Sequence, residues 1–116
     1  MKKVLVIISA LLSLSATGQT SIYEARQSGT GATVTVSGIV TTGDEFGTIR
    51  YVQDSTAGIA VYSNSLSSTE PGQNITVTGT LKDYYNLLEI SPVSSYSVNS
   101  SSNPLPDPLI ITPSQL

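Results

Sequence analysis

Two short apolar runs with a polar break between them form the most informative stretch of the chain. Residues 49–52 and 59–62 are rich in Ile, Val and Tyr, and Asp-Ser-Thr-Ala-Gly at positions 54–58 separates them. β-Branched and aromatic runs around such a cluster are typical of two antiparallel strands joined by a turn. Asp hydrogen-bonds the backbone two residues further on, and Gly takes a positive φ without steric cost. Residues 48–62 therefore predict a β-hairpin, in which Asp54 is interpreted as a structural turn residue.

A second pattern occurs twice. Residues 33–42 alternate apolar and hydroxyl side chains up to Gly38, which predicts a strand with a bulge or bend at that glycine. The pattern returns 41 residues later, where residues 72–81 align with residues 31–40 and Gly79 takes the place of Gly38. Two copies are too few for a solenoid. They favour two similarly bent strands in one closed sheet.

Three further segments complete the expected elements. Residues 21–28 predict two turns of helix that begin at a serine N-cap. The polar residues 63–72 predict a long loop that docks on the sheet through Leu66. Residues 87–98 predict a fifth strand that is broken or bulged near Pro92, because proline cannot donate to a strand ladder.

These elements indicate one architecture. Five short strands, with a helix or long loop between the third and fourth, predict an all-β fold: a five-stranded OB-type Greek-key barrel with a short N-terminal helix and an extended Pro-rich C-terminal tail. Bent first and fourth strands suit the corners of such a barrel. The alternative is an immunoglobulin-like sandwich, which needs about seven strands.

The N-terminus has the features of a secretory signal peptide. Lys2 and Lys3 are followed by the apolar residues 4–14 and then by small residues up to Gly18. We therefore predict that residues 1–18 are removed and that the protein is secreted, held at the cell surface or periplasmic, with no membrane attachment after cleavage. The alternative is a buried N-terminal strand or helix. The apolar run is too short for a membrane span, which needs ~20 residues.

The composition changes again near the C-terminus. Residues 103–108 are Pro-rich, as in an extended linker, and Thr112-Pro113 resembles the N-cap and first position of a helix. We therefore expect an OB-fold domain over residues 19–102, and residues 103–116 to be a linker or the start of a following segment in a longer protein. The alternative is a terminal tail that docks on the barrel.

Charge and composition narrow the possible functions. Without residues 1–18 the chain has three bases and eight acids, a net charge of −5, which counts against strong independent nucleic-acid binding. With no His and no Cys, it lacks the usual general base, thiol nucleophile and zinc ligands. The pair Asp44-Glu45 has no further ligands at the spacing of a Ca²⁺ site. We predict that this chain is not an enzyme and holds no cofactor or metal.

Four segments in one order and spacing carry a family resemblance. Residues 34–40, 51–62, 71–79 and 84–90 resemble the OB-fold domains near the N-terminus of secreted bacterial nucleases and related cell-surface proteins. The resemblance implies an accessory module that assists nucleic-acid binding, while a separate domain performs hydrolysis. Fold analogy alone does not establish function.

The ligand of an OB fold lies across strands two and three and the neighbouring loops. If Ile49 and Tyr51 face the core, Arg50 points outward and shares a surface with Tyr62. A cation beside a stacking ring is the combination used in single-strand binding. The alternative is a cross-strand pair that only holds the sheet together, and a register slip of one residue inverts the assignment.

The loop between strands four and five supplies further candidates. Two adjacent tyrosines, Tyr84 and Tyr85, are more than a turn needs, and we expect one to pack on the barrel rim and the other to be free. Lys82 and Asn86 flank them and complete the predicted ligand-binding set. Phe46, in the first long loop, is interpreted as a rim-packing residue.

Two main functional hypotheses follow, beside a third in which the chain is a standalone structural domain. The first is an exported OB-fold accessory module that binds single-stranded nucleic acid weakly in support of a nuclease domain in the same longer chain. The second is a protein- or carbohydrate-binding or spacer module of a secreted or surface protein, with no role in nucleic-acid binding. The charge of −5 favours the second, and the resemblance favours the first.

Overall fold

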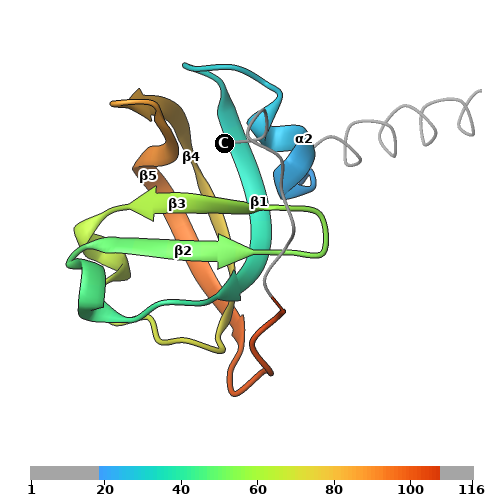
Figure 1. Cartoon of the computed structure of the whole chain (residues 1–116), viewed down its shortest axis with the longest axis vertical. Helices are drawn as coiled ribbons and strands as arrows, with labels where there is room; N and C mark the ends of the chain where they lie inside the picture. Colours follow the sequence, from blue (N-terminus) through green and yellow to red (C-terminus); the bar gives the residue numbers. More distant parts are fainter. Residues whose placement is uncertain (1–18, 108–116) are drawn as a thin grey trace, which may run out of the picture.

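The computed structural model describes residues 19–107 (Figure 1). The predicted signal peptide and the predicted helix start at Thr112-Pro113 lie outside these residues. In chain order the elements are α2 (Ile22–Arg26), β1 (Thr33–Val40), η1 (Asp44–Phe46), β2 (Ile49–Gln53), β3 (Gly58–Tyr62), η2 (Asn64–Leu66), β4 (Asn74–Tyr84) and β5 (Leu87–Ser100). Among the described residues, no helix is both long enough and apolar enough to span a bilayer.

The five strands close into a barrel in the order β1-β2-β3-β5-β4. Neighbouring strands are antiparallel except β3 and β5, which run parallel. The first three strands pair in chain order. β4 then pairs with β1 and not with β3, so the connection from β3 to β4 crosses the barrel. This topology confirms the predicted five-stranded OB-type barrel. The sandwich alternative is wrong.

The barrel interior is filled by aliphatic side chains from alternate strand positions. Along β1 the burial alternates without a break from Val34 to Val40, and the same alternation holds along β4 from Ile75 to Leu81. The short helix η2 contributes Leu66, which is fully buried as predicted. Burying an aliphatic side chain of this size stabilises the fold by roughly 1.5–3 kcal/mol. The interior cluster comprises Ile22, Ala25, Val34, Val36, Val40, Val52, Ile59, Val61, Leu66, Ile75, Val77, Leu81 and Ile90.

The two copies of the repeated pattern pair with each other. β1 and β4 are antiparallel, and Val36 lies opposite Val77, its own equivalent 41 residues later. A bulge or bend was predicted at these glycines, and a register irregularity is found at one of them. At Gly79 the β4–β5 register shifts on either side, whereas β1 keeps its register with β4 through Gly38.

Each glycine is nevertheless required by close packing. A Cβ on Gly38 would lie 2.7 Å from the Gln53 carbonyl oxygen, where β1 passes from pairing with β4 to pairing with β2. A Cβ on Gly79 would lie 2.5 Å from both Ile90 Cγ2 and the Pro92 carbonyl oxygen. β5 is continuous, and its register with β4 shifts beside Pro92, in agreement with the break or bulge predicted there. Pro92 follows a cis peptide bond.

Helix α2 packs at the turn end of the β2–β3 hairpin. Ser21 caps it, and Glu24 completes a capping box, while Ile22 and Ala25 are buried. Asp54 Oδ2 accepts a hydrogen bond from Ile22 N at 2.9 Å. One turn residue therefore holds both the hairpin and the start of the helix.

The first residues after β5 run along the barrel. Asn103 N donates to the Gly72 carbonyl at 2.9 Å, and Gln53 Nε2 donates to the Asp107 carbonyl at 2.9 Å. This part of the predicted tail is thus held against the end of β2.

Candidate binding groove

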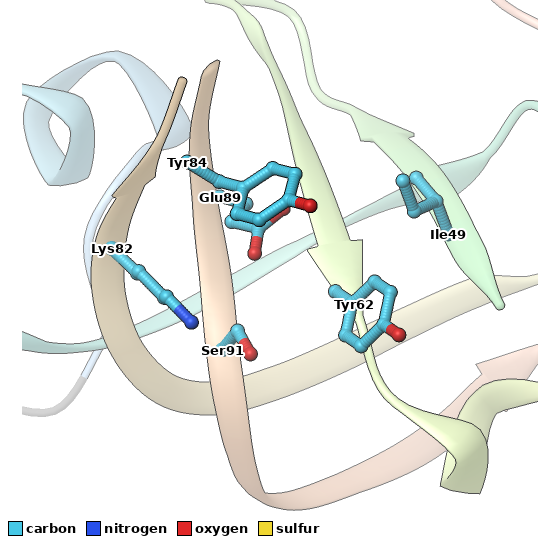
Figure 2. Close-up of a pocket in the computed structure, with 6 residues that line it drawn as sticks. All are labelled: Ile49, Tyr62, Lys82, Tyr84, Glu89 and Ser91. Atoms are coloured by element: carbon cyan, nitrogen blue, oxygen red, sulfur yellow. The ribbon is translucent and has the colours of Figure 1, made fainter. Parts of the chain in front are cut away.

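A groove of about 360 Å³ opens where β3, β4 and β5 meet, at the end of the hairpin away from its turn (Figure 2). It will be called the groove throughout. Three of the side chains around it were predicted as ligand contacts from the sequence, and three were not. Its lining residues are Ile49, Tyr62, Lys82, Tyr84, Glu89 and Ser91.

Strand pairing brings these residues together from distant parts of the chain. Ile49 lies opposite Tyr62 across the β2–β3 pair, and Lys82 lies opposite Glu89 across the β4–β5 pair. The parallel β3–β5 pair, in which Ala60 is the partner of Glu89, joins the two halves. The groove therefore forms only when the barrel closes.

Two half-exposed aromatic rings lie at the groove. Tyr62 ends β3 and is 48% exposed, and Tyr84 ends β4 and is 52% exposed. Tyr84 packs edge-on against Tyr85, with ring centroids 4.6 Å apart. Lys82 Nζ lies 6.0 Å from the centroid of the Tyr84 ring, at the outer limit of a cation–π contact. These contacts restrain Tyr84 while leaving part of its ring accessible.

Glu89 supplies the acidic group of the groove. It is only 3% exposed, and burial raises the pKa of its carboxyl above 4.5, an effect that the positive charge of Lys82 partly opposes. Within residues 19–107 the carboxylate has neither a hydrogen-bond partner nor an ion pair. In the view of Figure 2 the carboxylate overlaps the Tyr84 ring and points toward the space between Lys82 and Tyr62.

The predicted site residues separate into three groups. Tyr62, Lys82 and Tyr84 meet at the groove, whereas Tyr85 and Asn86 do not line it. These two form the tight β4–β5 turn, with φ values of 51° and 70°, as a two-residue type I′ turn requires. Of the two tyrosines, Tyr85 is the free one, at 87% exposure.

The assignment of Arg50 to the ligand surface is wrong. Its partner across the hairpin is Val61, which faces the core, so the arginine faces inward and is 1% exposed. Its guanidinium donates to the Gly47 carbonyl at 2.8 Å and to the Ser67 carbonyl at 3.1 Å. Arg50 therefore ties two loops together, and Ile49 takes the predicted place beside Tyr62.

Asp54 and Phe46 have the structural roles that the sequence predicts. Asp54 accepts hydrogen bonds from Thr56 N, Ala57 N and the Thr56 hydroxyl, which confirms its structural role. Phe46 packs edge-on against Tyr51 at 5.8 Å, in agreement with rim packing, although more than half of it stays exposed. Residues 19–107 contain no cluster of three or more His, Cys, Asp or Glu side chains that could hold a metal ion.

The sequence interpretation missed Ile49, Glu89 and Ser91. Glu89 did carry a signal, because it is an acid within the apolar run Leu87-Leu88-Glu89-Ile90, and a charged residue in a buried strand requires a reason. Its position opposite Lys82 depends on the β4–β5 register, which the sequence does not encode locally.

Comparisons with known proteins agree with this fold. No family model matches the chain. Endonuclease YhcR of Bacillus subtilis (strain 168) is 37% identical over 93 residues, which cover 72% of this chain and 8% of that protein. This chain is therefore homologous to a small region of that endonuclease. The structure of the hypothetical protein YgiW from E. coli matches 72% of this chain and 91% of its own, with a TM-score of 0.59 and 16% identity, and shows the same fold.

Proposed function

We propose that this barrel is an exported accessory module that binds single-stranded nucleic acid weakly in the groove, in support of a nuclease domain. One observation carries the proposal: Tyr62 and Tyr84, both half-exposed, line one groove with Lys82. The groove is lined by the start of the second strand, the end of the third strand and the parts of the fourth and fifth strands next to their connecting turn, close to the region where OB folds bind oligonucleotides. Homology to a region of an endonuclease supports the same role.

The expected binding is carried by stacking more than by charge. Each base stacked on an aromatic side chain contributes roughly 1–3 kcal/mol. Arg50 is buried, so Lys82 is the cation that lines the groove. With one phosphate contact, log K should fall against log salt with a slope of about −0.7. Binding is therefore expected to be weak and only slightly salt-dependent.

The chemical step is assigned to a different domain. The mature sequence has no His and no Cys, and the match covers 8% of the endonuclease. The proposal therefore places hydrolysis elsewhere in a longer protein and gives this barrel the task of holding the strand. Export rests on the signal-peptide pattern of residues 1–18.

The test is a titration of the full chain with a short fluorescent single strand, followed by fluorescence anisotropy. Tyr62→Ala and Tyr84→Ala should each weaken binding about fivefold or more. Tyr23→Ala is the matched control, because Tyr23 is 49% exposed and lies on α2, at the opposite end of the hairpin. Absence of binding at low salt, or equal losses in all three variants, would refute the proposal.

A carbohydrate ligand is the second candidate. The acidic Glu89 at the groove and the net charge of −5 favour a neutral, hydroxyl-rich ligand over a polyanion. OB folds also bind oligosaccharides, and a carboxylate accepts hydrogen bonds from hydroxyl groups. Competition of the fluorescent strand by neutral oligosaccharides, with the same loss in Tyr84→Ala, would favour this function.

A further inference from the structure

Glu89 is a buried acid without a partner at a ligand-sized groove. It is 3% exposed, and within the described part of the chain its carboxylate makes no hydrogen bond. The one fully enclosed side-chain polar atom without a partner in residues 19–107 is Arg50 Nε. Both Glu89 oxygens therefore keep an open side, and Figure 2 shows that this side faces the groove.

Such a carboxylate is matched by a ligand that donates two hydrogen bonds. An ionised carboxylate is an acceptor only, with two oxygens that take parallel N–H donors. Leaving a buried charge unpaired is costly, and a donor pair would remove that cost without moving the strand. The groove volume of about 360 Å³ is at the small end for ligand sites. It suits one base better than several.

Guanine is the base whose edge fits the groove. Its N1–H and N2 amino group lie side by side, with the acceptor O6 next to them. Glu89 offers two acceptors, and Lys82, its cross-strand partner, offers donors only. Adenine and cytosine each pair one amino donor with ring acceptors, and thymine has a single N–H between two acceptors. None of these presents two adjacent donors to a carboxylate.

We propose that Glu89 makes the groove selective for guanine in single-stranded nucleic acid, accepting hydrogen bonds from N1–H and N2–H while Lys82 donates to O6. The inference rests on the proposed function and goes beyond it, since stacking on Tyr62 and Tyr84 accepts any base. Glu89 is thus the specificity-determining residue, and the tyrosines supply affinity.

The test uses the full chain and thymine hexamers in which one central base is dG, dA, dC, dT or deoxyinosine. The dG strand should bind about tenfold more tightly than the dT strand, as expected of a good bidentate contact. Deoxyinosine lacks the N2 amino group, so its strand should lose most of that advantage. This comparison requires no variant protein.

Glu89→Gln gives the complementary evidence. Glutamine keeps the shape but replaces one acceptor by a donor, so the preference for the dG strand over the dT strand should fall to within about twofold. Glu70→Gln is the control, because Glu70 is an exposed acid that does not line the groove. It should keep the preference.

The outcomes separate the two proposals. Equal binding of all five strands, or a preference that persists in Glu89→Gln, overturns the guanine assignment and leaves the proposed function standing. Equal binding of the dG and deoxyinosine strands overturns it as well. No binding of any strand overturns the proposed function and this inference together.

Discussion

The hydroxyl oxygens of Thr35 and Thr78 lie 2.8 Å apart across the β1–β4 pair. Ser37 and Thr76 make the equivalent contact at 2.6 Å. The two contacts flank the pair Val36–Val77, so the two copies of the repeated sequence meet around a local two-fold axis. The hydroxyl positions of the repeat form a hydrogen-bonded row on the outer face, and its valines fill the core.

This row should contribute measurably to stability. In a double-mutant cycle of Thr35→Val and Thr78→Val, followed by urea denaturation, we expect a coupling free energy of about 0.5 kcal/mol. The pair Thr33–Thr80 provides the control, because it is also cross-strand but has no hydrogen bond between its hydroxyls. Equal coupling in both pairs would assign the effect to packing rather than to the hydrogen bond.

Asp54→Ala should destabilise the fold more than an ordinary turn substitution. The carboxylate accepts four hydrogen bonds, three within the turn and one from Ile22 N at the start of α2. The expected loss is about 2–3 kcal/mol in the free energy of unfolding. Asp54→Asn should keep part of the stabilisation, because one side-chain oxygen remains as an acceptor. A loss below about 0.5 kcal/mol would contradict the bridging role.

The same carboxylate predicts a pH dependence. Burial alone raises the pKa of Asp54, but the hydrogen bonds from Ile22, Thr56 and Ala57 outweigh it and hold the pKa below 3.8. Its stabilisation is therefore present above the unfolded value and is lost as the pH falls through the lower folded value. Melting temperatures of the wild type and Asp54→Asn should converge on acidification to about pH 2.

Glu89 should behave in the opposite sense. Burial raises its pKa above 4.5 in the folded state, so the folded protein holds the proton more tightly than the unfolded chain. Stability linked to this group is present below pH 4.5 and is lost as the pH rises through the folded value. Glu89→Gln should therefore be more stable than the wild type at neutral pH and equal to it at about pH 4. A thermal melt at both pH values checks this, with Glu70→Gln as the unchanged control.

Gly79→Ala should disturb the barrel where β4 and β5 are out of register. The new Cβ would lie 2.5 Å from backbone and side-chain atoms of β5, and we expect a loss of about 1–3 kcal/mol. Gly58→Ala is the control, because its Cβ would meet only the Val52 carbonyl oxygen at 3.5 Å. Equal effects of the two substitutions would contradict a requirement for close packing at Gly79.

The features predicted correctly from the sequence have local causes. The hairpin turn is determined by Asp54 and its neighbours, and helix α2 by the Ser21 cap and two buried residues. The repeated alternation of residues 31–40 and 72–81 was sufficient to place two core strands. Each signal lies within about ten residues of chain, which is the range over which turn and periodicity rules apply.

The errors arose where the choice of face depends on a partner strand. In Ile49-Arg50-Tyr51-Val52-Gln53 either set of alternate residues contains a large apolar side chain, so the alternation does not identify the core face. In the structure the partner strand decides the core face: Val61 faces the core, and Arg50, which pairs with it, therefore faces the core too. Glu89 was missed for the same reason, since its position depends on both β3 and β4.

The hydrogen bond between Gln53 and Asp107 fixes where the chain leaves the barrel relative to the groove. β2 begins at Ile49 beside the groove and ends at Gln53, where the chain after β5 is held. Four residues of strand separate these points, roughly 13 Å. The last residue that the structure describes, Asp107, is therefore held at a fixed distance from the groove by a direct contact with the barrel.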